Sequence, residues 1–199
     1  GGMTLLPTLK LRLDKPSDVI DLAAIDGLAD IAVSGDAVTI GGMTRHAAVN
    51  ASKEVQEAIP ALAKLAGGIG DPQVRNRGTI GGSVANNDPA ADYPSAVVGL
   101  GATVKTNKRE IAGDDFFTGL FETALEPGEI VTSVSFPIPD KAAYMKFPNP
   151  ASRYAIVGVF VSQGTQGTRV AVTGAGACVF RVSEMEQALG ENFSADAVA

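Results

Sequence analysis

The chain has 199 residues, of which 45% are hydrophobic and 19% charged, so it can build the core of one large domain or two small ones. A formal net charge of −6 argues against nucleic-acid binding, and one cysteine with one histidine cannot supply the four ligands of an iron–sulfur cluster or a structural zinc ion. No apolar run reaches the ~20 residues of a membrane helix and no signal peptide is present, which predicts a cytoplasmic protein.

The first third of the chain predicts short elements separated by glycine turns. Residues 1–12 run from a glycine turn into an amphipathic segment, and the compact apolar run at 19–22 predicts a strand. A hairpin is predicted from strands at 31–33 and 38–42 around Ser34-Gly35-Asp36. Three helices follow in the prediction: one capped by Thr44, one capped by Ser52, and one that Pro60 opens and Gly67-Gly68 ends.

The remainder predicts an α+β organisation with a boundary near 137–150. We expect a loop at 67–83, a helix at 89–98 that Asp88-Pro89 begins, a strand at 101–106, a loop at 111–119, a turn at Pro127-Gly128 and a strand at 130–136. Pro148 and Pro150 mark a break. After it we expect an antiparallel meander of 154–162, 169–173 and 178–181, followed by a helix at 183–189.

Residues 78–94 are the most informative stretch. Gly81 and Gly82 have no side chain, so their amides could approach a diphosphate closely, and Thr79 and Ser83 add hydroxyl donors beside them. A Gly-Gly pair alone is also typical of a plain turn. Because the chain lacks a basic surface, it would have to hold a diphosphate mainly through backbone amides and local geometry.

Taken in order, Ile69-Gly70-Asp71-Pro72-Gln73-Val74-Arg75-Asn76-Arg77-Gly78-Thr79-Ile80-Gly81-Gly82-Ser83 and Asp88-Pro89-Ala90-Ala91-Asp92-Tyr93-Pro94 closely resemble one family. This family is the FAD-binding medium subunit of molybdenum hydroxylases, especially the carbon monoxide dehydrogenase type. The likeness spans nearly the whole chain: Gly1-Gly2-Met3-Thr4 resembles the family's first pyrophosphate loop, and 172–176 resembles its C-terminal domain.

The resemblance implies a mixed-sheet FAD-binding domain, of the vanillyl-alcohol-oxidase type, over residues 1–136. A small domain of antiparallel sheet and helix over 137–199 would follow it. Members of the family usually have further sequence before the first glycine loop and after the last helix here, so we expect both domains to lack a part. The cofactor implied is FAD.

The resemblance also implies which residues bind the cofactor. They form two glycine loops, a polar acceptor and several residues around the flavin ring: Gly1, Gly2, Met3, Thr4, Ile69, Gly70, Thr79, Ile80, Gly81, Gly82, Ser83, Asp92, Val131, Lys146 and Tyr154. Each residue type also has an ordinary structural role. The loops could be turns, Ile69 and Val131 could be core residues, Tyr154 could be core, and Asp92 and Lys146 could be solvated. His46, near a helix start, is interpreted as a structural residue rather than a base.

In this family the substrate is oxidised at a molybdopterin large subunit, and electrons pass through 2Fe–2S clusters on a small subunit to FAD. We therefore expect an electron-transfer subunit with those two partners and no catalytic acid or base of its own. Two alternatives stay open: a self-contained FAD-dependent oxidase or reductase, and a non-enzymatic assembly subunit. Arg75 and Arg77 could face the iron–sulfur subunit or pair with acids.

Overall fold

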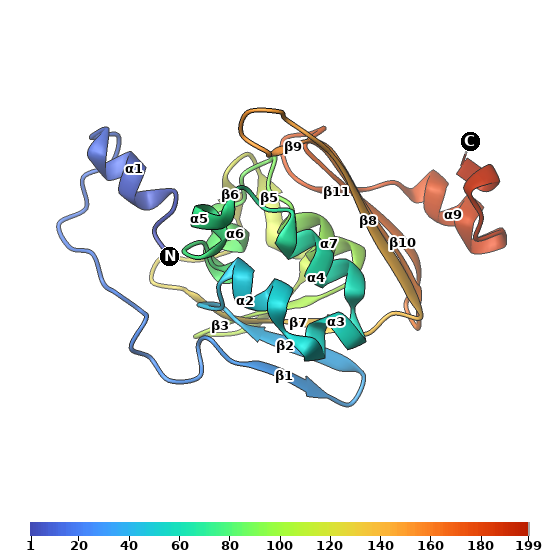
Figure 1. Cartoon of the computed structure of the whole chain (residues 1–199), viewed down its shortest axis with the longest axis horizontal. Helices are drawn as coiled ribbons and strands as arrows, with labels where there is room; N and C mark the ends of the chain where they lie inside the picture. Colours follow the sequence, from blue (N-terminus) through green and yellow to red (C-terminus); the bar gives the residue numbers. More distant parts are fainter. Residues whose placement is uncertain (199) are drawn as a thin grey trace.

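The computed structural model describes residues 1–198 and places a layer of helices between two sheets (Figure 1). The first sheet has the strand order β1–β2–β7–β3–β4, and the second has the order β11–β10–β9–β8. The strands of the first sheet are β1 (Ile31–Ser34), β2 (Ala37–Gly41), β7 (Val131–Pro137), β3 (Thr103–Thr106) and β4 (Glu110–Ala112). A separate pair consists of β5 (Phe117–Gly119) and β6 (Glu122–Thr123).

The hairpin of β1 and β2 forms as predicted. Ile31 pairs with Ile40 across it, and Gly35 adopts a φ of +61° in the turn. Val38 and Ile40 alternate with Thr39 along β2, so both face the helix layer and are fully buried. This alternation fixes which face of the sheet meets the helices.

The helix layer begins with α2 (His46–Ala51), α3 (Lys53–Ala58) and α4 (Pro60–Gly67). The Ser52 hydroxyl accepts a hydrogen bond from the Val55 amide at 3.3 Å, and Pro60 occupies the first turn of α4, both as predicted. Thr44 does not cap α2. Arg45 holds that position without a side-chain hydrogen bond. The Thr44 backbone carbonyl accepts from the Ile80 amide at 3.0 Å.

The segment predicted as a loop at 67–83 holds helical structure. It contains α5 (Pro72–Arg75) and the start of α6 (Ile80–Asn86), which Thr79 caps by accepting from the Gly82 amide at 3.2 Å. The next helix, α7 (Tyr93–Gly99), starts four residues later than the predicted residue 89. The Asp88 side chain instead closes a turn by accepting from the Ala90 amide at 2.9 Å.

The second sheet packs on the other side of α7. Its strands are β8 (Lys141–Pro148), β9 (Ala155–Gly164), β10 (Gly167–Thr173) and β11 (Phe180–Arg181), and it is followed by α9 (Ser183–Glu191) and η1 (Ala195–Val198). The Ser162 hydroxyl donates to the Gly99 carbonyl at 2.6 Å, and a Cβ on Gly99 would lie 2.9 Å from the Phe160 ring. The chain passes from the first sheet to the second between Pro137 and Lys141, within the predicted boundary; the division into two domains stays a prediction.

Three further expectations about the elements were wrong. Every strand pairing within residues 1–198 is antiparallel, so the first sheet is not mixed. Residues 19–22 form no strand, since no neighbouring strand pairs with them, and Val19 and Ile20 are exposed. The predicted loop at 111–119 holds the end of β4, the short helix α8 (Gly113–Phe116) and β5.

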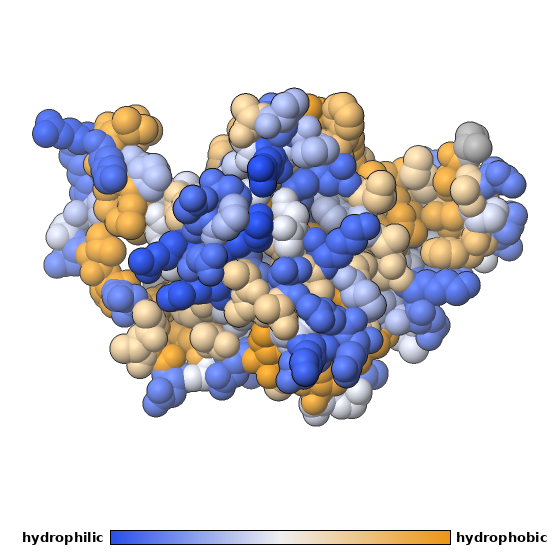
Figure 2. All heavy atoms as spheres, in the orientation of Figure 1, coloured by the Kyte–Doolittle hydropathy of each residue, from blue (hydrophilic) through white to orange (hydrophobic). Residues whose placement is uncertain are grey.

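The N-terminal segment extends away from the two sheets and the helix layer between them. Its helix α1 (Leu5–Lys10) buries no residue, and it stands apart on the left of Figure 1. Large apolar side chains of the segment lie on the surface, including Leu11 and Leu13, which are 70% and 76% exposed. Orange spheres gather over this region in Figure 2. Among the described residues, no helix combines the length and apolarity needed to cross a membrane.

Candidate cofactor-binding cleft

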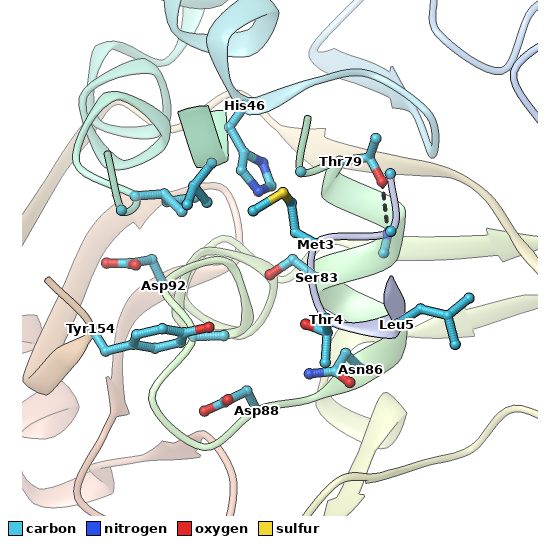
Figure 3. Close-up of a pocket in the computed structure, with 18 of the residues that line it drawn as sticks. Met3, Thr4, Leu5, His46, Thr79, Ser83, Asn86, Asp88, Asp92 and Tyr154 are labelled. Atoms are coloured by element: carbon cyan, nitrogen blue, oxygen red, sulfur yellow. Dashed lines mark hydrogen bonds between the residues drawn. The ribbon is translucent and has the colours of Figure 1, made fainter. Parts of the chain in front are cut away.

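A cleft of about 470 Å³ opens between the N-terminal segment and the helix layer (Figure 3). One wall consists of residues 1–5 with the start of α1, and the facing wall is the side of α6 that bears Gly82, Ser83 and Asn86. Residues 69–70 and 152–154 close one end. The volume lies within the range of ligand and cofactor sites, roughly 300–1,000 Å³.

Eleven of the fifteen residues expected to bind the cofactor line this cleft: Gly1, Gly2, Met3, Thr4, Ile69, Gly70, Thr79, Gly82, Ser83, Asp92 and Tyr154. They come from five separate parts of the sequence. The structure therefore brings the two glycine segments, 1–4 and 79–83, to opposite walls of one space. Ile80, Gly81, Val131 and Lys146 lie outside it.

Three of these four residues belong to the packing behind the cleft. Ile80 is fully buried in the core. Gly81 packs on Gly42, the residue that follows β2: a Cβ on Gly81 would lie 2.7 Å from the Gly42 carbonyl oxygen. Gly42 in turn sits against Val131, whose carbonyl oxygen would be 2.3 Å from a Cβ on Gly42. These contacts make the strand-to-helix connection so tight that only glycine fits at 42 and 81.

The amides at the start of α6 are not free for a diphosphate. The amides of Ile80 and Gly81 donate to the carbonyls of Thr44 and Gly42, and those of Gly82 and Ser83 donate to the Thr79 hydroxyl and carbonyl. On the opposite wall, the amides of Met3, Thr4 and Leu5 have no acceptor among residues 1–198. The first glycine segment therefore offers unpaired backbone donors to the cleft.

The second glycine segment contributes shape and hydroxyl groups. A Cβ on Gly82 would meet only the Thr79 hydroxyl, at 3.0 Å, so this face of α6 is open to the cleft. Ser83 and Asn86 follow on the same face and point into the cleft with Thr4 opposite (Figure 3). Hydroxyl and amide groups of this kind can donate to phosphate oxygens.

At the other end of the cleft, Asp92 is 4% exposed and is held by two side chains of β8. The Tyr144 hydroxyl donates to Asp92 Oδ1 at 2.5 Å, and Lys146 Nζ lies 2.9 Å from the same oxygen. Burial raises the pKa of Asp92, while Lys146 and Tyr144 favour the ionised form. Burial and the neighbouring carboxylate raise the pKa of Tyr144, so its hydroxyl stays protonated and acts as a donor.

Lys146 points toward the same face as Tyr144, as the strand period predicts, but it does not line the cleft. Its ammonium contacts Asp92 and donates to the carbonyls of Gly68, at 2.8 Å, and Arg153, at 3.0 Å. An ammonium group has three donors. All three are therefore used within the protein.

Arg75 pairs with no acid among residues 1–198. Its guanidinium donates to the carbonyls of Ile69 and Gly70, at 3.1 and 2.9 Å, and so supports the backbone of the segment that closes the cleft. Arg77 forms no salt bridge with another described residue. Tyr154 is 47% exposed at the rim, and burial of part of its ring together with Asp88 and Asp92 raises its pKa.

His46 also lines the cleft, although the sequence predicts only a structural role for it. Its ring lies 5.3 Å from that of Tyr93, and it points toward Met3 in Figure 3. A Cβ on Gly78 would lie 2.5 Å from Nε2, so a glycine there leaves room for the imidazole. Burial lowers the pKa of His46 to about 4, which makes the ring neutral at pH 7.

The other lining residues that the sequence analysis did not single out are mostly neighbours of those it did: Leu5, Thr8, Asp14, Val74, Gly78, Asn86, Asp88, Ala91, Ser152 and Arg153. Helical spacing was an available signal for Asn86, which lies three residues after Ser83 and on the same face. Within residues 1–198, no group of three or more His, Cys, Asp or Glu residues could hold a metal ion.

Comparisons with known proteins agree with this architecture. The family described as FAD binding domain in molybdopterin dehydrogenase matches residues 1–139. The 6-hydroxypseudooxynicotine dehydrogenase complex subunit alpha of Paenarthrobacter nicotinovorans is 36% identical, over 95% of this chain and 68% of its own length. The glyceraldehyde dehydrogenase medium chain of Sulfolobus acidocaldarius is 33% identical, over 100% and 75%.

Among solved structures, a chain of carbon monoxide dehydrogenase from Hydrogenophaga pseudoflava superposes with a TM-score of 0.91 at 35% identity. The alignment covers 99% of this chain and 73% of that one. Fold and sequence together define a flavoprotein subunit of the molybdenum hydroxylases. The chain belongs to the family of FAD-binding domains in molybdopterin dehydrogenases, as an oxidoreductase subunit of the carbon monoxide dehydrogenase medium-chain type.

Proposed function

We propose that FAD binds in the cleft and that the chain passes electrons from 2Fe–2S clusters on a small subunit to an external acceptor. A molybdopterin large subunit would carry the oxidation of the substrate. The observation that carries the proposal is the convergence of the two glycine segments, 1–4 and 79–83, on one cleft in a chain of an FAD-binding family.

The groups present suit a dinucleotide cofactor. The unpaired amides of Met3, Thr4 and Leu5 and the hydroxyl of Ser83 would hold the diphosphate, because N–H and O–H donors favour anionic oxygens. Asp92 would accept from a hydroxyl or N–H of the cofactor, and Tyr154 would cover it at the rim. When bound, FAD supplies the redox chemistry, while the protein binds, orients and tunes it.

The partner assignment rests on the relatives. Their names refer to chemically different substrates, among them 6-hydroxypseudooxynicotine, glyceraldehyde and carbon monoxide. One subunit type that accompanies all of these enzymes is suited to a step they share, namely electron transfer. We therefore place the choice of substrate on the large subunit.

The test is a titration of the purified chain with FAD, followed by visible absorption after removal of free cofactor. Bound flavin is expected, and Gly82→Leu should weaken binding at least tenfold because its side chain would fill the open face of α6. Gly190→Leu is the matched control, since a Cβ on Gly190 meets no atom within 4 Å. Equal binding by the Gly82→Leu chain would contradict the placement of FAD in this cleft.

A further inference from the structure

Lys146 connects three segments that are far apart in the sequence. Its ammonium bonds to the carbonyl of Gly68 at the end of α4, to the carbonyl of Arg153 in the connection between β8 and β9, and to Asp92 at the start of α7. Residues next to each of these contacts line the cleft: Ile69, Tyr154 and Asp92 itself. One side chain therefore sets the spacing of that end of the cleft.

The two oxygens of Asp92 have different surroundings. Oδ1 takes both protein donors, the Tyr144 hydroxyl at 2.5 Å and the Lys146 ammonium at 2.9 Å. Oδ2 accepts no hydrogen bond from any residue that the structure describes. Two donors on one oxygen orient the carboxylate and leave the second oxygen available as an acceptor.

We propose that Lys146 and Tyr144 are positioning residues, which hold Asp92 and the segments 68–70 and 152–154 in place. Of these three side chains, only Asp92 would then contact the cofactor, through Oδ2. This inference rests on the proposal that the cleft binds FAD. It differs from the role that the family resemblance implies for Lys146, which is to lie beside the flavin ring, because the three donors of its ammonium are used and its charge is paired with a buried carboxylate.

The two roles differ in a measurable quantity, the ratio of the dissociation constants for oxidised and reduced FAD. A cation beside the ring stabilises the anionic reduced flavin, so its loss would change this ratio about tenfold or more. A positioning residue weakens both redox forms alike. Lys146→Met is therefore expected to raise both dissociation constants about tenfold. Their ratio is compared between the Asp92→Asn and Asp92→Asn/Lys146→Met chains, in which no unpaired carboxylate lies beside the cofactor, and it is expected to agree between the two within about twofold.

Hydrogen exchange of the cofactor-free chain gives a second readout that does not depend on FAD. In the native chain the connection is closed by the Asn149 and Arg153 amides, which donate to the Tyr154 and Asn149 carbonyls at 2.8 and 2.9 Å. Lys146→Met should accelerate exchange at both amides, because the Arg153 carbonyl loses its anchor. Lys141→Met, on the exposed end of the same strand, is the control and should change neither exchange nor affinity.

Tyr144→Phe tests the second positioning residue without disturbing the connection. It should weaken FAD binding about three- to tenfold, through a misplaced Asp92, while exchange at Asn149 and Arg153 stays native. Should Lys146→Met fail to fold, the Asp92→Asn/Lys146→Met chain removes the unpaired buried carboxylate and allows the exchange measurement.

The inference would be overturned by native exchange in Lys146→Met together with an affinity ratio that differs between Asp92→Asn and Asp92→Asn/Lys146→Met, which would indicate direct contact with the flavin. Unchanged FAD affinity in Tyr144→Phe would remove Tyr144 from the proposal. If the native chain bound no FAD while the exchange pattern appeared as expected, the proposed function would fail and the structural role of Lys146 would stand.

Discussion

At the scale of single residues, Gly81 and Gly82 are adjacent in the first turn of α6 but have different roles. Gly81 touches the backbone of Gly42, whereas Gly82 faces the open cleft. Gly81→Ala should lower the free energy of unfolding by about 1–3 kcal/mol through overpacking. Gly82→Ala should be neutral or raise it by up to about 1 kcal/mol, because alanine is the better helix former. Urea denaturation measures both changes, and equal destabilisation by the two substitutions would contradict this assignment.

His46 predicts a dependence of stability on pH. Its pKa is about 4 in the folded chain, below the ordinary value of 6.5. Between these values the unfolded chain binds a proton that the folded chain does not, so stability rises with pH through this window and is complete above 6.5. The contribution is at most about 3 kcal/mol.

Chemical denaturation of the native and His46→Asn chains between pH 4 and 7 measures this contribution. The native chain should lose stability more steeply as the pH falls from 6.5. The raised pKa of Asp92 acts in the opposite direction, but it is present in both chains and cancels in the comparison. Parallel curves would show that the His46 imidazole is not kept neutral by the fold.

Single-residue roles were only partly predictable from sequence. Of the residues that the glycine and hydroxyl pattern of 79–83 predicts to bind the cofactor, Thr79, Gly82 and Ser83 line the cleft, and their binding of the cofactor stays a prediction. The hydrogen-bond partners of the amides in this segment were not predictable, since the Ile80 and Gly81 amides donate to carbonyls of Thr44 and Gly42, which are distant in the sequence. For Lys146 the deciding partner, Gly68, is 78 positions away in the sequence.

At the scale of elements, α5 supports one end of the cleft. Asp71 caps it by accepting from the Val74 amide at 2.9 Å, and Arg75 at its end holds the Ile69 and Gly70 carbonyls. Asp71→Ala should cost about 1 kcal/mol of stability and should also weaken FAD binding. Ser52→Ala removes the cap of α3 and serves as a matched control.

Thermal denaturation measures the stability of the Asp71→Ala and Ser52→Ala chains, and FAD titration measures their affinity for the cofactor. The Ser52 variant should lose a similar amount of stability but keep its affinity, because α3 does not line the cleft. A similar loss of affinity in both variants would indicate that general stability, rather than α5, controls binding.

Elements with a local signal were predictable, as in the hairpin and in α3, because β-branched alternation and a capping serine act through near neighbours. Two other elements needed distant information. The start of α7 was predicted at 89 rather than 93, since Asp88-Pro89 and Asp92-Tyr93-Pro94 both resemble a helix start. The run at 19–22 has strand composition, but a strand also requires a neighbouring strand to pair with.

At the scale of the whole molecule, the two sheets share one core through α7. Phe160 of β9 is fully buried and packs against Gly99, and the Thr173 hydroxyl donates to the Ala91 carbonyl at 2.7 Å. We expect a single calorimetric unfolding transition. Phe160→Ala should lower the free energy of unfolding by about 3–5 kcal/mol, and its unfolding should still show one transition. Two separate transitions would show that the part after residue 137 unfolds as its own domain.

The three contacts of the Lys146 ammonium should slow its chemical labelling. Amine-reactive reagents attack the free, deprotonated amine. The Lys146 side chain is only 10% exposed, and its ammonium contacts three acceptors within the protein. Lys105, whose side chain is 59% exposed, should be labelled readily under the same conditions. Mass spectrometry should therefore find Lys146 among the last lysines to be modified. Its label would then appear only in molecules in which this end of the cleft has come apart, which makes the residue a built-in reporter of that opening.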